Sequence, residues 1–153
     1  MAKSIPHWYP RVTPYLAIDG AAAAIEFYKK AFGANERMRM GGAEGKIGHA
    51  EIEIEGGLIM LADEYAPMNF RSPKTIGGSP VMIHIYVADV DAFFARATAA
   101  GAEVLRPPAD QFYGDRSCTI RDPFGHAWSV ATHVEDVSPQ EMEKREAKMA
   151  GGS

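Results

Sequence analysis

The chain contains the same order of elements twice, and this repeat restricts its fold more than any other feature of the sequence. Three pairs of matching positions have one separation, because 82 − 13, 125 − 56 and 129 − 60 all equal 69: Thr13 with Met82, Gly56 with Gly125, and Met60 with Ser129. A single offset that aligns an opening strand, a turn and a closing strand indicates an internal duplication. We therefore expect two related modules.

Alternation of apolar and polar residues predicts the strands of the first module, and an apolar stripe predicts its helix. Ile25, Tyr28 and Phe32 recur at the spacing of one helical face, and Gly33 supplies a left-handed stop. The expected elements are a strand over 13–18, a helix over 21–31, and strands over 35–40, 49–54 and 58–62.

The second module repeats this order. Val90, Phe93 and Ala97 form its helical stripe, which Gly101 ends. The segment 122–125 has proline and glycine in fitting places for a tight turn, and we expect its role to be purely structural. The expected elements are a strand over 81–87, a helix over 90–100, a short strand at 104–105, a loop over 106–113, and strands over 117–121 and 126–132.

A βαβββ unit covers one face of its sheet with a helix, so two such units can pair and enclose a cavity. We predict an α+β fold in which two βαβββ modules form paired mixed sheets around a central cleft. Together they make one domain. Its expected parts are an N-terminal leader over 1–12, a first module over 13–62, a linker or flap over 63–80, a second module over 81–132, and a C-terminal helix and tail over 133–153.

Composition and charge exclude several classes of partner. The hydrophobic content of 46% and the charged content of 24% are ordinary for one globular domain of 153 residues. The net charge of −4, with no basic stripe, argues against a nucleic-acid partner, and no apolar run approaches the roughly 20 residues of a membrane helix. Cys118 is the only cysteine, so an intrachain disulfide cannot form and the cytoplasm is the default compartment.

Several short motifs accompany the repeat. They are Glu26-Phe27-Tyr28 in the first helix, Asp122-Pro123-Phe124-Gly125-His126 before the last strand, and the segments 46–51, 110–116 and 128–132. With the duplicated unit, the first two resemble the vicinal oxygen chelate superfamily, which contains glyoxalase I, extradiol dioxygenases and bleomycin-resistance proteins. The other three look like its PhnB-like, glyoxalase-like subgroup. The resemblance covers roughly residues 10–149 and implies a small-molecule ligand and a homodimer.

The resemblance also implies a metal ion held by four side chains, which here are Thr13, Met60, Met82 and Ser129. Divalent cations bind imidazole, carboxylate or thiolate groups, and these four side chains offer none of them. We therefore expect the usual metal site to be lost and no cofactor to be needed. The alternative is a divalent metal at displaced ligands, drawn from His49 and His84 with Glu51 or Asp115.

Strand parity places further candidates on the cleft face. His84 lies two residues beyond Met82 and is the candidate catalytic residue, either as a general base or as a buried structural histidine. Tyr15 and Tyr86 either bind a ligand or fill the sheet interface. The candidate ligand-binding residues are Tyr15, His49, Met60, Met82, His84, Tyr86, Phe112, Tyr113, Arg116 and Ser129.

Residues in the loop before the last hairpin have two interpretations. Phe112 and Tyr113 either cap the mouth of the pocket or anchor the loop. Arg116 either clamps a carboxylate or phosphate of a ligand or forms a structural pair with an aspartate. Trp128 and Cys118 are expected to be core residues.

Three functions are compatible with these residues. The first is metal-independent binding of a small organic molecule in the cleft between the modules. The second is an enzyme, a lyase or isomerase that uses His84 and His49 for acid–base or metal chemistry. The third, a protein-interaction module built on the polar helix over 140–149, has weaker support. Trp8 and Tyr9 in the leader need cover from the body or from a second subunit, which favours a homodimer.

Overall fold

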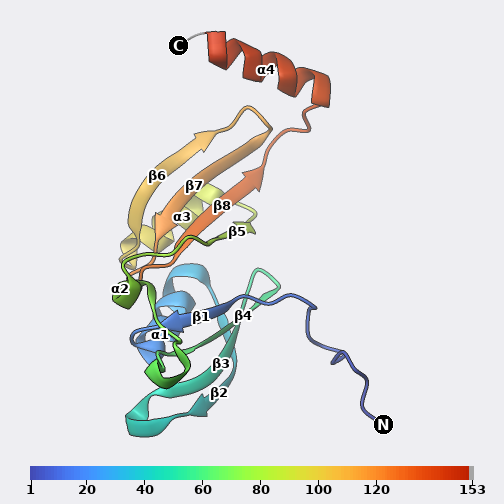
Figure 1. Ribbon diagram of the computed structural model, residues 1–153. Coiled ribbons are helices and arrows are strands. Elements are labelled where there is room, and N and C mark those ends of the chain that lie inside the picture. The colour runs from blue at the N-terminus through green and yellow to red at the C-terminus, as the bar shows by residue number, and fades with distance from the viewer. Residues whose placement is uncertain (152–153) are drawn as a thin grey trace.

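The computed structural model describes residues 1–151 and contains the two predicted modules (Figure 1). The first module consists of β1 (Tyr15–Ile18), α1 (Ala21–Phe32), β2 (Asn35–Gly41), β3 (Ile47–Ile54) and β4 (Gly57–Asp63). The second consists of β5 (Met82–Tyr86), α3 (Val90–Ala99), β6 (Glu103–Asp110), β7 (Asp115–Arg121) and β8 (Ala127–His133). Short helical turns at 43–45, 66–68 and 73–76 (α2, Pro73–Ile76) and the C-terminal α4 (Pro139–Gly151) complete the chain.

The two sheets have the same topology, and their parallel strand pairs have the same register. The strand order is β1-β4-β3-β2 in one and β5-β8-β7-β6 in the other, with one parallel pair in each. Tyr15 pairs with Met60 across the first parallel pair, and His84 pairs with Ser129 across the second. Both partners are shifted by the predicted offset, so the internal duplication and the α+β fold are confirmed.

The helices α1 and α3 each begin where a carboxylate accepts hydrogen bonds from free backbone N–H groups. The Asp63 carboxylate accepts hydrogen bonds from the backbone of Gly20 and Ala21, which fixes the start of α1 against the end of β4. Asp89 caps α3 through the backbone N–H of Ala92. Gly33 ends α1 at a φ of 68°, as its position in the sequence predicts.

The two modules share one core, which lies where α1 packs against α3 and against the second sheet. Rings of both modules meet there: Phe32 stacks on Phe93 at 5.1 Å between centroids and meets Trp128 edge-on at 4.9 Å. At the end of α1, the Arg96 guanidinium donates to the carbonyl oxygens of Lys29 and Lys30. In Figure 1 the two sheets therefore follow one another along the molecule.

A buried carboxylate ties this core together. Asp122 lies in the turn before β8 and is 3% exposed. One of its oxygens accepts hydrogen bonds from the backbone of Phe124 and His126, and the other accepts them from the Tyr28 hydroxyl at 2.5 Å and the Trp128 indole at 2.9 Å. The expected structural turn thus holds a helix of module one and a strand of module two.

The strand β6 differs from the prediction. We expected a strand only at 104–105 and a loop over 106–113, whereas β6 runs over Glu103–Asp110. Pro107 and Pro108 suggested a loop because proline has no N–H to donate to a sheet. However, β6 is an edge strand that pairs only with β7, and its register shifts between Arg106 and Ala109, so the prolines interrupt few hydrogen bonds.

Both ends of the described chain extend away from the two sheets (Figure 1). Residues 1–14, here called the N-terminal arm, expose Trp8 and Val12, and α4 has no buried residue. Ser138 caps α4 through the backbone N–H of Glu141. Of the C-terminal helix and tail expected over 133–153, α4 includes Gly151, and 152–153 lie outside the described residues. Within 1–151, no helix has the length and apolar character needed to cross a membrane.

We predict that replacing the buried carboxylate destabilises both modules together. The substitution Asp122→Ala leaves the Tyr28 hydroxyl and the Trp128 N–H buried without an acceptor. At about 1–3 kcal/mol for each such group, the free energy of unfolding should fall by about 4 kcal/mol. Urea unfolding followed by tryptophan fluorescence measures this loss.

Two further variants define the controls for this measurement. Tyr28→Phe removes one of the four hydrogen bonds and should lower the free energy of unfolding by about 1 kcal/mol. Asp19→Ala, at an exposed site, should change it by less than about 0.5 kcal/mol. If Asp122→Ala resembled Asp19→Ala, the central role of this carboxylate would be refuted.

Candidate functional site

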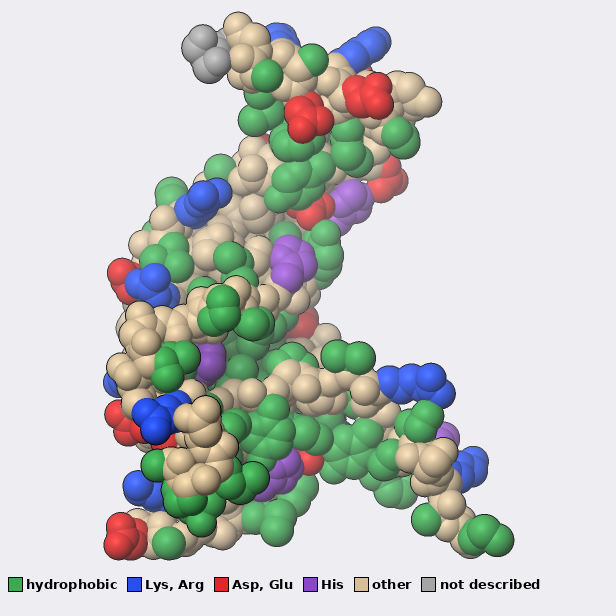
Figure 2. Space-filling view, in the orientation of Figure 1, with side chains coloured by type: hydrophobic (Ala, Val, Ile, Leu, Met, Phe, Trp, Pro, Cys, Tyr) green, Lys and Arg blue, Asp and Glu red, His purple; other side chains and the backbone are tan. Residues whose placement is uncertain are grey.

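The face of each sheet opposite its helix, here called the open face, carries the polar and aromatic candidates. Alternate residues of the inner strands point into the core, as Ile52 and Leu61 do in the first sheet and as Leu16 does in β1, so their neighbours point to the open face. Figure 2 shows histidine and apolar side chains on the hollowed side of the molecule, between the N-terminal arm and the second sheet. The open-face residues are Tyr15, His49, Glu51 and Met60 in module one, and Met82, His84, Tyr86, Asp115 and Ser129 in module two.

A chain of hydrogen bonds crosses the open face of module one. The Tyr15 hydroxyl lies 2.6 Å from Nδ1 of His49, and Nε2 of His49 lies 2.9 Å from Oε2 of Glu51. Tyr9 of the N-terminal arm donates to both Glu51 oxygens, at 2.9 and 3.1 Å, and leaves that carboxylate 2% exposed. Burial raises the pKa of Glu51, but the hydrogen bonds from His49 and Tyr9 together lower it by more, so the net shift is downward. Glu51 is therefore ionised at neutral pH.

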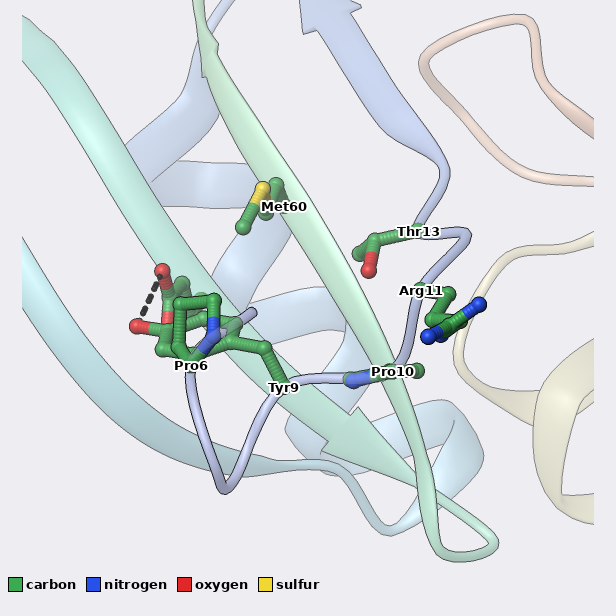
Figure 3. A pocket seen from close by; sticks show the side chains of 7 residues that line it. Pro6, Tyr9, Pro10, Arg11, Thr13 and Met60 are labelled. Atoms are coloured by element: carbon green, nitrogen blue, oxygen red, sulfur yellow. Dashed lines mark hydrogen bonds between the residues drawn. The ribbon is translucent and has the colours of Figure 1, made fainter. Parts of the chain in front are cut away.

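The N-terminal arm encloses a first pocket, of about 480 Å³, over this face. Figure 3 shows the arm passing beneath the sheet, with Thr13 and Met60 directed toward the space between them. Arg37 lies 5.0 Å from the centre of the Tyr9 ring and helps to hold the arm in place. The pocket exists because Tyr9 reaches Glu51, so the arm is part of the site.

A second pocket, of about 750 Å³, lies beside the first module's open face, between the 41–48 loop and the segment 62–70. Tyr15 forms part of its wall and meets Phe70 edge-on at 5.5 Å between ring centroids. The segment over 63–80, expected to be a linker or flap, here forms a wall, because Tyr65 and Phe70 pair with one another as an isolated bridge. Apolar lining is supplied by Ile47, Ala62, Met68 and Phe70.

The open face of module two carries a different set of groups. Nδ1 of His84 lies 2.9 Å from the Ser129 hydroxyl, and the His84 ring meets Tyr86 edge-on at 4.8 Å. The Tyr86 hydroxyl donates to Asp115 at 2.7 Å. Met82 and Tyr86 are 52% and 55% exposed. The structure thus brings four predicted residues together on one surface that is open to a ligand.

Asp115 also connects this face to the C-terminal segment. His133 lies 2.8 Å from Asp115 and 2.7 Å from Asp136, one carboxylate at each ring nitrogen. Burial raises the pKa of Asp115, but the hydrogen bonds from His133 and Tyr86 together lower it by more, so the net shift is downward. The hydrogen bonds to Asp136 and then Asp115 raise the pKa of His133. This arrangement ties the end of β8 to the site.

Three predicted residues lie away from the open faces. Arg116 projects to the helix side of β7, where its guanidinium meets Asp91 at 2.9 and 3.0 Å and Asp110 at 3.2 Å. Phe112 and Tyr113 form the turn between β6 and β7, with their rings 5.3 Å apart and edge-on. Tyr113 lies near enough to Tyr86 to help raise the pKa of that tyrosine, after the hydrogen bond to Asp115, burial and the charge of Asp115. The role of Phe112 and Tyr113 in ligand binding stays a prediction.

Sequence reasoning missed the groups supplied by tertiary contact. Tyr9 and Phe70 come from the arm and from the linker, and His133 follows the expected end of the last strand. A signal existed for the pair His49 and Glu51, because two residues at i and i+2 on a strand share one face. No local pattern indicates that Tyr9 reaches Glu51.

The four positions implied for a metal ion carry side chains that do not fit one. Thr13, Met60, Met82 and Ser129 are two hydroxyls and two thioethers, which are poor ligands for a divalent cation. Nor does the part of the chain described here contain a group of three or more His, Cys, Asp or Glu side chains placed to hold one. The alternative ligands His49 and His84 belong to different sheets.

Comparisons with known proteins agree with this geometry. The model of the Glyoxalase/Bleomycin resistance protein/Dioxygenase superfamily matches residues 9–130, and the chain belongs to that superfamily. An uncharacterized protein of Mycobacterium tuberculosis is 42% identical over 146 residues, which cover 94% of this chain and 86% of that protein.

Two solved structures show the fold. TioX from Micromonospora sp. ML1 is 29% identical, with a TM-score of 0.65 over 82% of this chain and 100% of that one. TnmS3, an antibiotic binding protein from Streptomyces sp. CB03234, is 19% identical, with a TM-score of 0.62 over 86% of this chain and 99% of that one. At that identity, the likeness to TnmS3 concerns the fold alone.

We predict that His133 makes stability depend on pH above its usual pKa of 6.5. Because folding raises this pKa, the stabilisation is fully present below pH 6.5 and is lost as the pH rises through the pKa of the folded state. The His133→Gln variant removes it. The melting temperature of the wild type should therefore exceed that of the variant. The difference between the two should be largest near about pH 5.5 and should shrink towards about pH 8.5.

Asp115 produces the opposite dependence at acid pH. Its pKa is lowered from 3.8, so its stabilisation is present above that pH and is lost as the pH falls through the pKa of the folded state. The measurement on His133 is therefore made above pH 5. A difference between wild type and variant that stayed constant from pH 5.5 to 8.5 would contradict the role of His133.

Proposed function

We propose that this protein binds a small organic molecule against the open faces of its sheets, without a metal ion. The observation that supports the proposal is the exposure of aromatic and thioether side chains beside hydrogen-bonding groups. Tyr15, Met82 and Tyr86 are 45%, 52% and 55% exposed. Tyr15 lies at hydrogen-bond distance from His49 and Tyr86 from Asp115, and Met82 is two residues from His84 on the same side of β5. Such a surface suits an aromatic ligand that also carries polar groups.

We further propose that a second copy of the chain completes the cleft. In one chain the modules are joined through α1, α3 and the turn at Asp122, and the open face of module two remains exposed. Trp8 and Val12 on the arm are 69% and 86% exposed, and α4 buries no residue. A homodimer would cover these apolar groups and set an open face of one copy opposite an open face of the other.

One comparison and one set of sequence motifs support this proposal. The fold of this chain is shared by TnmS3, an antibiotic binding protein, so the fold is able to hold an organic ligand of that kind. The motifs at 46–51, 110–116 and 128–132 support membership of the PhnB-like subgroup within the superfamily. We take the cytoplasm as the compartment because the chain has a single, buried cysteine.

A second function is favoured by one observation. Both His49 and His84 have a ring nitrogen at hydrogen-bond distance from a hydroxyl on an open face, 2.6 Å in one case and 2.9 Å in the other. This is the arrangement that acid–base catalysis requires. The alternative function is therefore a lyase or isomerase in which His84 or His49 moves a proton.

We predict that the protein is a dimer in solution. Light scattering coupled to gel filtration should give twice the 16.6 kDa mass of one chain. Replacing Trp8 and Val12 by serine should shift the equilibrium towards the monomer, because the arm then loses its apolar contacts. A monomer at all concentrations of wild-type protein would refute the second copy.

We predict that Tyr86 contributes to ligand binding. A panel of aromatic antibiotics, bleomycin among them, is screened by thermal shift. At 100 times its Kd, a ligand adds about 2.7 kcal/mol to the free energy of unfolding, which corresponds to an increase of about 5 °C or more in Tm. The Tyr86→Ala variant should lose at least about half of that increase.

The matched control is Ile76→Ala, an exposed residue of α2 that should bind as the wild type does. Equal Tm increases in the Tyr86 and Ile76 variants would remove the open face of module two from the ligand site. No increase with any compound of the panel would contradict the proposed function.

A further inference from the structure

Tyr15 differs from the other tyrosines in the partner of its hydroxyl. All six tyrosines lie within the described residues, and Tyr15 is the one whose hydroxyl has an imidazole nitrogen at hydrogen-bond distance. Tyr9, Tyr28 and Tyr86 donate to carboxylates instead. A phenol beside an imidazole has a base within reach, whereas a phenol beside an ionised carboxylate has only a weak one.

The hydrogen bonds define where the protons lie. Because the ionised Glu51 accepts from Nε2 of His49, a neutral His49 carries its proton on Nε2 and leaves Nδ1 free. The Tyr15 hydroxyl then donates to Nδ1 at 2.6 Å. When His49 takes the second proton, the imidazolium that forms lies against the negative charge of Glu51, which stabilises it.

The phenol needs this base in order to react. Burial and the nearby charge of Glu51 raise the pKa of Tyr15, so its hydroxyl stays protonated at neutral pH. A reaction at the oxygen therefore requires the proton to leave as the new bond forms. His49 is the acceptor at the right distance, and Glu51 positions it.

A ligand can reach the same oxygen. Tyr15 is 45% exposed and forms part of the wall of the 750 Å³ pocket, beside Phe70. Ile47, Ala62 and Met68 give that pocket an apolar lining suited to an aromatic group. The pocket belongs to one chain, so it does not depend on the cleft between two copies.

We propose that Tyr15 is a catalytic acid–base residue that transfers a proton to and from an aromatic ligand in this pocket, with His49 and Glu51 as its relay. In the forward step, an acidic proton of the ligand moves to the Tyr15 oxygen as the Tyr15 proton moves to Nδ1 of His49. The ligand becomes an anion opposite the imidazolium. The reverse transfer, to the same or a neighbouring atom of the ligand, restores all three groups and needs no other reactant.

An aryl sulfonyl fluoride tests the step on which the proposal depends. Benzenesulfonyl fluoride reacts with a phenol when an O–S bond forms, the S–F bond breaks, fluoride leaves and the phenol proton passes to a base. The full-length protein is treated with benzenesulfonyl fluoride, and modification of each tyrosine is followed by peptide mass spectrometry. We expect Tyr15 to react at least about tenfold faster than the exposed Tyr65, Tyr86 and Tyr113.

Two variants assign the reactivity. His49→Gln removes the base and should slow modification of Tyr15 by at least about tenfold, while Tyr65 reacts at its wild-type rate and reports an intact fold. Tyr15→Phe should abolish the fast modification altogether. The comparison between tyrosines within the wild-type protein needs no variant, so the test survives if His49→Gln fails to fold.

Two results would overturn the proposal. One is a wild-type protein in which Tyr15 reacts no faster than Tyr65 and Tyr86. The other is a folded His49→Gln variant in which Tyr15 reacts at the wild-type rate. Failure of the antibiotic screen or of the dimer measurement leaves these rates unaffected, so the inference and the proposed function are tested separately.

Discussion

Asp122 accepts four hydrogen bonds, and these hold the two halves of the molecule in one arrangement. A carboxylate that is removed from water is tolerated only if donors surround it. Here two donors come from its own turn, one from β8 and one from α1 of the other module. Because these donors converge on a single group, the sheets cannot rotate about each other without breaking them. The positions of the open faces follow from this constraint.

The duplication explains how one framework carries two different sites. Equivalent positions on the two parallel strand pairs hold Tyr15 beside Met60 in one module and His84 beside Ser129 in the other. The register of the parallel strands is the same in both modules, so the differences at these positions lie in the side chains. In the first sheet a phenol meets an imidazole and a carboxylate, and in the second an imidazole meets a hydroxyl.

The sequence was sufficient for the modules, the helices, the stop at Gly33 and the turn at Asp122, because each has a local signal: periodicity, glycine at positive φ, or proline in a turn. It was insufficient for β6, where Pro107 and Pro108 suggested a loop. Whether proline interrupts a strand depends on whether that strand lies at an edge, and strand order is a property of the whole sheet.

Strand parity also explains which site residues could be placed. Tyr15, His84 and Tyr86 were assigned to the correct face because their strands were recognised. Arg116 was not, since the expected strand began at 117 whereas β7 begins at Asp115. With the true start, Arg116 shares its side with the buried Cys118 and faces α3. Tyr9 and Phe70 gave no signal, because their contacts with the site join segments far apart in the chain.

The reach of Tyr9 to Glu51 gives the start of the chain an influence that its exposed position conceals. Proteolytic cleavage after residue 12 would leave both sheets intact, yet it would let water reach the Glu51 carboxylate and remove one of its donors. The hydrogen bond from Tyr9 is one of the causes that lower the pKa of Glu51, and the cut would remove it. A cut outside the sheets would thus act on the electrostatics of a group within the site.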